Sequence, residues 1–203
     1  MLLDLIKLKE KHNMNITGVI HIGAHYGEEN KVYNDLNIQN RIFFEPLTSN
    51  FEVLQRAVGN DYTLIKKALG NDNKKINMYV EKANNGQSSS ILKPVLHLQQ
   101  YPSIVFDEVE EVEMSRLDDC NLDLSQYNFI NIDVQGYELE VFKGAVTKLS
   151  SVDYIMTEVN RAEVYQDCAQ VSELINFLSP YGFKLVEVDW AGYTWGDGLF
   201  IKS

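Results

Sequence analysis

Residues 129–138 read Phe-Ile-Asn-Ile-Asp-Val-Gln-Gly-Tyr-Glu. The apolar start of this stretch predicts a buried strand, and the polar residues and glycine that follow predict a turn into a helix. Asp133 and Glu138 then lie near the carboxyl end of the strand, the edge of an open α/β sheet where ligands bind. As purely structural alternatives, Asp133 would cap the helix and Glu138 would complement its dipole.

Buried strands and amphipathic helices alternate on both sides of this stretch. That alternation predicts an α/β fold with a mostly parallel sheet and helices on both faces. The last two strands are separated by a loop too short for a helical crossover, so we expect them to pair antiparallel. The expected strands are residues 19–22, 41–45, 62–67, 129–132, 154–159, 183–188 and 199–201, and the expected helices are 27–36, one capped by Ser49, 137–149 and 168–179.

The middle of the chain has a different pattern. Apolar residues at 76–80 and 112–114 alternate with polar ones, which predicts edge strands exposed on one side. Residues 84–90, Asn-Asn-Gly-Gln-Ser-Ser-Ser, have the composition of a flexible loop, which we expect to close over the substrate as a lid. Without an internal repeat or linker, residues 1–203 are expected to form one domain, with an amphipathic helix in 1–17 and the core in 18–203.

The composition excludes several classes of protein. The chain is 45% hydrophobic and 23% charged, close to globular averages, so wholesale disorder is excluded. Its net charge of −11 disfavours nucleic acid or an anionic membrane as a partner and favours a small or neutral substrate. Cys120 and Cys168 have no companions at zinc-site spacing and are expected to be free thiols. Charges interrupt the N-terminal leucines, so we expect no signal peptide and a cytoplasmic protein.

The first strand ends in Ile22-Gly-Ala-His-Tyr-Gly27, a turn whose free amides suit a carboxylate or phosphate. Glu45 ends the second strand, where an acidic residue can accept hydrogen bonds from ribose hydroxyls. The turn lacks the middle glycine of Gly-x-Gly-x-x-Gly, which favours an adenosyl ligand with an amino-acid tail over a dinucleotide. The alternatives are an ordinary glycine turn and a solvated strand-end carboxylate.

Glu158 ends the fifth strand, and Asn160 follows two residues later on the same side. Glu138 and Glu158 are candidates for a general base if burial raises their pKa, with His25 a weaker one. Asp133, Glu158 and Asn160 are also oxygen ligands suited to magnesium, so the sequence leaves a metal open. Solvent-exposed strand ends are the structural alternative.

Two further sets of residues have open roles. His12 and His97 have no companion at metal-ligand spacing, so we expect them at the surface or in packing contacts. Aromatic residues near the C-terminus either form a platform for a sugar ring or cover the sheet edge; they are Trp190, Tyr193 and Trp195.

Six motifs recur in a characteristic order and spacing over residues 18–203: Ile22–Gly27, Phe44-Glu-Pro46, Ala68-Leu-Gly70, Ser88-Ser-Ser90, Phe129–Ala145 and Tyr154–Glu158. In these motifs the chain resembles the FkbM-type S-adenosylmethionine-dependent methyltransferases. The resemblance implies a Rossmann-like methyltransferase fold, S-adenosyl-L-methionine as cofactor and O-methylation of a hydroxyl on a sugar, glycan or small natural product.

The resemblance also implies roles for particular residues. The methionine part of the cofactor would lie over residues 23–27, its ribose on Glu45 and its adenine beside Ala68 and Leu69, while Asp133 orients the methyl donor. The implied cofactor-binding residues are His21, Gly23, Ala24, His25, Gly27, Glu45, Pro46, Ala68, Leu69 and Asp133, and the candidate catalytic residues are Asp133, Glu138 and Glu158.

The chain departs from the family pattern at His21, Asn131 and Gln135, where Asp, Lys and Glu are common. These departures leave the base and the substrate class open. They also leave a non-catalytic adenosyl-binding module as an alternative. A nicotinamide-dependent oxidoreductase, which would share the glycine turn and Glu45, is a second alternative. The sequence defines neither the acceptor, the pathway, the metal requirement nor the oligomeric state.

Overall fold

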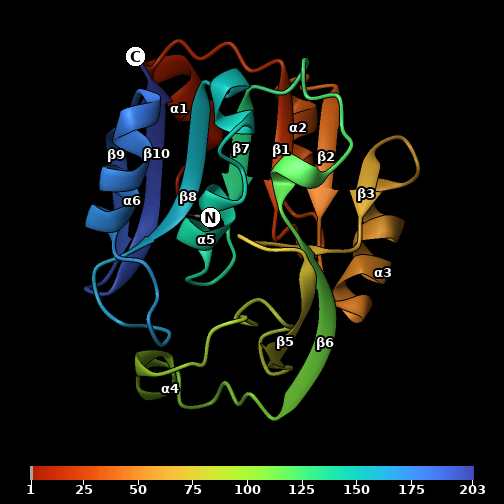
Figure 1. Ribbon diagram of the computed structural model, residues 1–203, viewed down its shortest axis with the longest axis vertical. Helices are drawn as coiled ribbons and strands as arrows, with labels where there is room; N and C mark the ends of the chain where they lie inside the picture. The colour runs from red at the N-terminus through yellow and green to blue at the C-terminus, as the bar shows by residue number, and fades with distance from the viewer. Residues whose placement is uncertain (1) are drawn as a thin grey trace.

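The computed structural model describes residues 2–203 and contains a seven-stranded sheet (Figure 1). Its strands are β1 (Gly18–Ile22), β2 (Asn40–Phe44), β3 (Thr63–Ile65), β7 (Phe129–Ile132), β8 (Tyr154–Asn160), β9 (Phe183–Ala191) and β10 (Trp195–Lys202). They lie in the order β3-β2-β1-β7-β8-β10-β9. The first five pair in parallel, whereas β10 pairs antiparallel with β8 and β9. The predicted fold class and the antiparallel C-terminal pair are confirmed.

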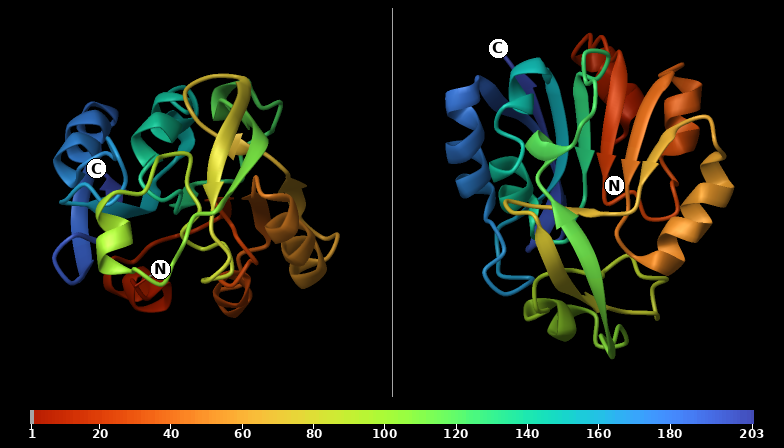
Figure 2. Two further views of the ribbon diagram at one scale, coloured as in Figure 1. Left: turned by 90° about the horizontal axis from the view of Figure 1, so that it is seen from below. Right: turned by 45° about the vertical axis from the view of Figure 1, so that its right-hand side comes forward.

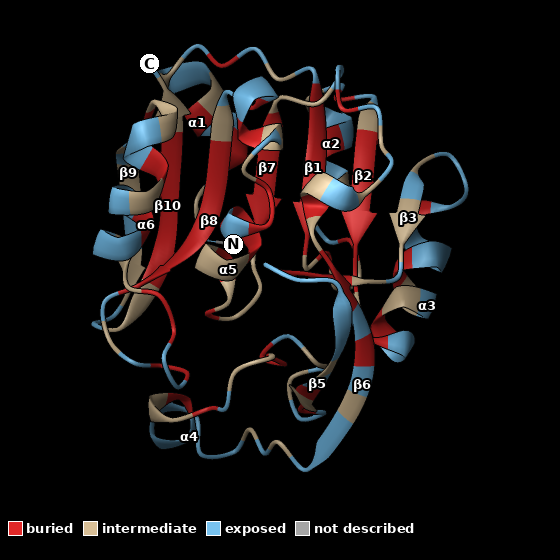
Figure 3. Ribbon diagram, in the orientation of Figure 1, coloured by how far each residue is buried: buried red, intermediate tan, exposed pale blue. Residues whose placement is uncertain are grey.

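Helices cover both faces of this sheet (Figure 2). Successive residues of a strand point to opposite faces, so Val19 packs in one helical layer and Ile20 in the other. Because both faces are covered, the central strands are buried along their length (Figure 3). The layer around Val19 contains α1 (Leu5–Lys11), α2 (Asn30–Asp35) and α3 (Thr48–Val58), and the layer around Ile20 contains α5 (Glu138–Lys143) and α6 (Val171–Leu178).

A second, three-stranded sheet lies beyond the carboxyl ends of the parallel strands (Figure 1). Met78 and Met114 pack there with Leu47, which follows β2, so the small sheet has its own apolar cluster beside the crevice. Residues 112–114 belong to the central strand of this sheet, so the prediction that they form an edge strand was wrong. The elements of this region are β4 (Ala68–Leu69), β5 (Lys74–Val80), β6 (Glu108–Ser115) and the unpredicted α4 (Leu96–Gln100), with the small sheet ordered β4-β6-β5.

Helix ends differ from the sequence prediction where distant residues determine them. Helix α3 begins at Thr48, whose backbone N–H donates to the Glu110 carboxylate of β6 at 3.0 Å, so the predicted cap by Ser49 was wrong. Helix α5 ends at Lys143, well before residue 149, and Gly144 follows against the backbone of Gly70. Contacts between segments far apart in the sequence therefore determine where α3 begins and where α5 ends.

The N-terminal amphipathic helix is confirmed in a shorter form, α1, which Asp4 caps by accepting from Ile6 N and Lys7 N. None of the helices in residues 2–203 combines the length and the apolar character needed to cross a bilayer. Cys120 and Cys168 are free thiols, as predicted, and Cys168 is buried.

Gly23 lies where the turn after β1 passes over the end of β7. Its φ is +76°, and a Cβ atom there would overlap the carbonyl oxygen of Asp133. The N–H groups of Gly23 and Ala24 both donate to the Phe44 carbonyl oxygen at 2.9 Å. The turn is therefore held between the neighbouring strands β2 and β7, and only glycine fits both its φ and its clearance.

We predict that Gly23→Ala lowers the free energy of unfolding by about 2–4 kcal/mol more than Gly59→Ala does. Gly59 also has a positive φ, +73°, but no atom lies within 4 Å of the position of its Cβ, so it controls for backbone strain alone. Urea unfolding of both variants measures the difference. Equal losses would show that the approach to Asp133 does not constrain the turn.

Candidate active site

The Glu45 carboxylate connects the two turns that begin the crevice. Its Oε2 accepts the His25 N–H and its Oε1 accepts the Leu47 N–H, each at 2.9 Å. The side chain is buried, and burial raises its pKa to about 7 although these backbone donors oppose the shift. Each carboxylate oxygen has a second lone pair, so Glu45 has acceptor capacity left for ligand hydroxyls.

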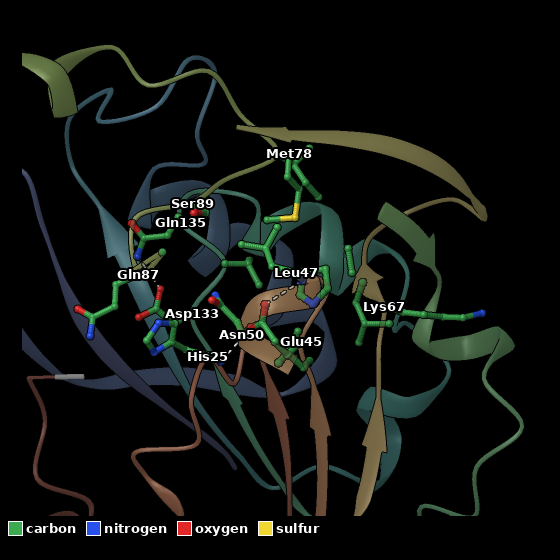
Figure 4. A pocket seen from close by; sticks show the side chains of 18 residues that line it. His25, Glu45, Leu47, Asn50, Lys67, Met78, Gln87, Ser89, Asp133 and Gln135 are labelled. Atoms are coloured by element: carbon green, nitrogen blue, oxygen red, sulfur yellow. Dashed lines mark hydrogen bonds between the residues drawn. The ribbon is translucent and has the colours of Figure 1, made fainter. Parts of the chain in front are cut away.

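A narrow pocket begins at Glu45 (Figure 4). Its polar end contains Glu45 and Asn50, and Met78 lies on the opposite wall, whereas the Lys67 side chain points away. The free volume is only about 60 Å³. The loop over the pocket comes close to its floor, since a Cβ at Gly86 would lie 3.0 Å from Asn50 Nδ2. The apolar walls come from Pro46, Leu47, Ala68, Leu69, Met78 and Ile91.

A larger cavity of about 590 Å³ adjoins the narrow pocket. Its lining is acidic and aromatic and contains no lysine or arginine. The residues common to both cavities are Gly23, His25, Gln87, Asp133 and Gln135, and the further acidic and aromatic lining residues of the larger cavity are Glu28, Glu29, Glu158, Asp197, His21, His97, Tyr101 and Trp195.

Gln135 organises the boundary between the two cavities. Its Nε2 donates to Asp133 Oδ1 at 2.7 Å and to Glu158 Oε2 at 2.8 Å. Its Oε1 accepts the Tyr165 hydroxyl at 2.7 Å. The Gln135 backbone has a φ of +54°, which turns the chain sharply after β7. A single amide group thus holds the half-buried carboxylate that follows β7 and the buried carboxylate of β8 in fixed positions.

Burial dominates the ionisation of these acids. It raises the pKa of Asp133 and raises that of Glu158 well above its ordinary value, with the neighbouring carboxylates adding to the shift at Glu158. Asp197, opposite Glu158 in the β8–β10 register, has its pKa raised to about 6 by burial and by Asp133. Its carboxylate accepts the backbone N–H groups of Leu2 and Leu3. The carboxyl groups of the cavity therefore have pKa values above the ordinary range of Asp and Glu.

Glu138 lies outside both cavities. Its Oε1 accepts the N–H groups of Val134 and Gly136 at 3.1 Å, which closes the turn between β7 and α5. Burial raises its pKa to about 7. The structure thus gives Glu138 the role of a turn-closing carboxylate at the start of a helix, and the predicted catalytic role has no geometric support.

Most of the predicted cofactor residues come together in the crevice. Ala24 and Gly27 do not line either cavity, because Ala24 is in the core and a Cβ at Gly27 would lie 2.8 Å from Leu54 of α3. The residues that do line the crevice are His21, Gly23, His25, Glu45, Pro46, Ala68, Leu69 and Asp133.

The two histidines of the first turn are already engaged by protein groups. His21 Nδ1 lies 3.3 Å from the Tyr33 hydroxyl, and burial lowers the pKa of His21. His25 Nδ1 lies 2.7 Å from Glu28 Oε1, and its Nε2 donates to the Asn85 carbonyl oxygen at 2.8 Å. Burial opposes protonation of His25, but these contacts raise its pKa overall.

No group of three or more His, Cys, Asp or Glu side chains within residues 2–203 is arranged to hold a metal ion. Asn160 presents its amide nitrogen to Glu158 Oε1 at 3.2 Å, and Gln135 occupies the other oxygen of Glu158. Of the three residues considered as magnesium ligands from the sequence, Asn160 and Glu158 are hydrogen-bonded to each other, and Asp133 is linked to Glu158 through Gln135.

The C-terminal aromatic residues separate into different environments. Trp195 lines the larger cavity and donates from Nε1 to the Tyr101 hydroxyl at 3.1 Å. Trp190 packs under the Arg161 guanidinium, 4.1 Å from the ring centroid, and Tyr193 is 89% exposed. Only Trp195 of the three can contact a ligand in the cavity.

Sequence reasoning assigned no site role to Asn50, His97 or Asp197, which the structure places in the crevice. Asp197 lies between two glycines in an otherwise apolar strand, and Asn50 lies four residues before Leu54 on the buried face of its helix. Polar residues at positions expected to be apolar were the available signal for both. His97 had no such signal, because no regular element was expected there.

The strand order, the glycine turn and the crevice at the carboxyl edge define a Rossmann-like protein of the methyltransferase type. The family model described as the methyltransferase FkbM domain matches residues 21–185. The chain belongs to this family.

Individual relatives agree with this assignment. The 2-O-methyltransferase NoeI of Sinorhizobium fredii is 35% identical over 101 residues, which are 49% of this chain and 41% of NoeI. The chain thus matches less than half the length of that relative. The structure of magnesium protoporphyrin IX methyltransferase from Synechocystis was solved with bound S-adenosylmethionine. It aligns with this chain at a TM-score of 0.51 and 12% identity, and the alignment covers 98% of this chain and 76% of the Synechocystis protein. A ribosomal protein L11 methylase from Lactobacillus delbrueckii aligns at a TM-score of 0.55 and 10% identity, and the alignment covers 98% of this chain and 76% of the methylase. At these identities the solved structures show a common fold.

We predict that Gln135→Glu lowers the free energy of unfolding at pH 7 by about 2–4 kcal/mol, because it replaces an amide donor with a third acid in contact with Asp133 and Glu158. The new carboxyl would have a raised pKa in the folded state. Its neutral form is therefore favoured, and the destabilisation should be small near pH 4 and grow as the pH rises.

Urea unfolding between pH 4 and 8 tests this prediction. The matched control is Gln87→Glu, which makes the same change at an exposed position on the rim of both cavities. A loss for Gln135→Glu that is equal to the control and independent of pH would contradict the role given to the amide.

Proposed function

We propose that this chain is an S-adenosylmethionine-dependent methyltransferase that acts on a hydroxyl of a sugar, glycan or small natural product. The observation that carries the proposal is the pair of adjoining cavities. One ends at the Glu45 carboxylate, the other is large enough for an acceptor, and they meet at Asp133 and Gln135. At such a boundary, a methyl donor in one cavity and a hydroxyl acceptor in the other would come within reach of each other.

The residues present fit the adenosyl cofactor. Glu45 has free acceptor capacity for the two ribose hydroxyls, and the apolar side chains of Leu69 and Met78 suit the faces of an adenine ring. The acidic lining around Asp133 suits the cationic methionine part. When bound, S-adenosylmethionine supplies an electrophilic methyl group. The chain's own residues then hold the acceptor in line, and such alignment contributes up to about 7–11 kcal/mol to catalysis.

The narrow pocket implies a moving loop. Its free volume of about 60 Å³ is too small for adenosine while residues 84–90 lie over Asn50. The loop is held from within, since the Glu81 carboxylate accepts the N–H groups of Asn84 and Ser88, and Ser88–Ser90 are buried. It is less flexible than its composition suggested. We propose that residues 84–90 open as a folded unit to admit the cofactor and therefore act as a lid.

The larger cavity favours an acceptor without negative charge. Its lining carries several carboxylates and neither lysine nor arginine, so a phosphate or carboxylate on the acceptor would be repelled. Trp195 offers an aromatic wall of the kind that packs against a sugar ring. The relative NoeI is a 2-O-methyltransferase, which supports a hydroxyl acceptor. The net charge of −11 supports a partner other than nucleic acid, and we propose a cytoplasmic location.

Calorimetric titration with S-adenosylhomocysteine tests the cofactor assignment. We predict about tenfold weaker binding at pH 6 than at pH 8, because ribose hydroxyls bind the Glu45 anion and the pKa of Glu45 is about 7. Glu45→Gln should bind about 10- to 100-fold more weakly at pH 8 and lose most of the pH dependence.

Glu52→Gln, an exposed change of the same type on α3, is the control and should bind like the wild type. A parallel titration with NAD should give no binding. Binding of NAD without binding of S-adenosylhomocysteine would contradict the proposal and favour the oxidoreductase alternative.

A further inference from the structure

His97 is a cavity residue rather than a surface residue. It lies in α4, beyond the carboxyl edge of the main sheet, and lines the larger cavity. The side chain is only 4% exposed and packs among three aromatic rings, with centroids 5.1 Å from Tyr101, 5.2 Å from Phe106 and 5.5 Å from Tyr165. The ring is therefore held in place by packing on several sides, which agrees with the packing alternative of the sequence analysis and not with the surface alternative.

The imidazole of His97 lacks the hydrogen bonds that a buried histidine normally makes. Its Nδ1 is enclosed and has no partner, and neither ring nitrogen bonds to another group in the part of the chain that the structure describes. Buried polar atoms without partners are rare in folded proteins because each costs about 1–3 kcal/mol. Because Nδ1 is enclosed, a ligand group in the cavity can reach this ring only through Nε2, which bonds to no described protein group.

The other histidines of the cavity do not share this property. His21 is in contact with Tyr33, and both ring nitrogens of His25 are engaged by Glu28 and Asn85. Of the cavity histidines, His97 alone within residues 2–203 has its imidazole free for an acceptor.

The candidate carboxylates are also less suited to accept a proton. Both oxygens of Glu158 already accept amide donors, from Gln135 and Asn160, and Glu138 lies outside the cavity. Burial raises the pKa of Glu158 well above its ordinary value, which favours the neutral carboxyl, and a protonated carboxyl cannot act as a base.

The protonation state of His97 suits a proton acceptor. Burial lowers its pKa, opposed by the charge of Glu81, so the ring is neutral at neutral pH. Tyr101 and Tyr165 are the titratable groups packed against the ring. The cavity carboxylates face it across the space for the acceptor; they are Asp133, Glu158 and Asp197. Asp197, whose pKa is raised only to about 6, would carry negative charge at neutral pH and so stabilise the imidazolium that forms during the reaction.

We propose that His97 is the catalytic base, which binds the acceptor hydroxyl and takes its proton during methyl transfer. The inference rests on the proposed function. As the acceptor oxygen forms its bond to the methyl carbon, the carbon–sulfur bond of the sulfonium breaks and its electron pair remains on sulfur. The hydroxyl proton moves to the His97 ring, so the products are a methyl ether, neutral S-adenosylhomocysteine and an imidazolium that later releases its proton to water.

The first test requires no acceptor. Diethylpyrocarbonate acylates neutral, unpaired imidazole nitrogens, and mass spectrometry locates the modified histidine. In the wild-type protein with S-adenosylhomocysteine bound, we expect His97 to react at least tenfold faster than His21 and His25, whose nitrogens are engaged. An acceptor-site base must be reachable from the cavity, so a His97 that stays unmodified while the other two react would overturn the proposal.

The second test measures transfer of tritium from methyl-labelled S-adenosylmethionine to a panel of p-nitrophenyl pyranosides. We expect His97→Gln to lower kcat by about 10²- to 10⁴-fold with the Kd for S-adenosylhomocysteine changed less than twofold. His12→Gln, the same change at a histidine bound to Glu187 outside the cavities, should leave kcat unchanged. Added imidazole should restore part of the activity of His97→Ala.

The outcomes separate this inference from the proposed function. A wild-type protein that does not bind S-adenosylhomocysteine contradicts the proposed function itself. A wild type that binds it but methylates no pyranoside contradicts the sugar acceptor, and the acylation test still decides whether His97 is open to the cavity. A His97→Gln variant that keeps the wild-type kcat overturns the role of His97 while leaving the methyltransferase assignment intact.

Discussion

The close approach of Gly23 to the backbone of Asp133 is the constraint on which the crevice depends. With its positive φ and no Cβ, Gly23 lets the turn after β1 cross directly over the end of β7. The same turn brings the His25 N–H to the Glu45 carboxylate. Three neighbouring strands of the sheet, β2, β1 and β7, therefore end in one connected set of contacts, and both cavities open from it.

The crevice contains several acidic side chains and few cations, and Gln135 reduces the repulsion between two of these acids by donating hydrogen bonds to both. Its amide donates to both Asp133 and Glu158, and burial shifts these acids toward their neutral forms. The result is a site that is polar but carries less negative charge than its composition suggests. Such a site can receive a cationic donor and a neutral acceptor, and the base is then the imidazole of His97 in a separate wall.

The sequence was sufficient for the parallel core and for the strand-end acids, because buried strands carry unbroken apolar runs and their carboxyl ends meet at one edge. It was insufficient where distant contacts decide the outcome. The cap of α3 comes from Glu110, which is far from Thr48 in the chain. The sequence position of Glu138 made it a candidate for the catalytic base. In the structure its carboxylate instead accepts the backbone N–H groups of the turn between β7 and α5. His97 belongs to a short helix without a periodic pattern, so only the folded structure shows that it faces a cavity.

A crystal structure with S-adenosylhomocysteine would show whether the crevice that begins at Glu45 holds the cofactor. We expect the ribose hydroxyls within hydrogen-bonding distance of Glu45, the adenine between Leu69 and Met78, and the sulfur at the boundary formed by Asp133 and Gln135. We also expect residues 84–90 to be displaced from Asn50. If the compound binds elsewhere, or if that loop still fills the crevice and Glu45 contacts only its own backbone partners, the crevice is not the cofactor site.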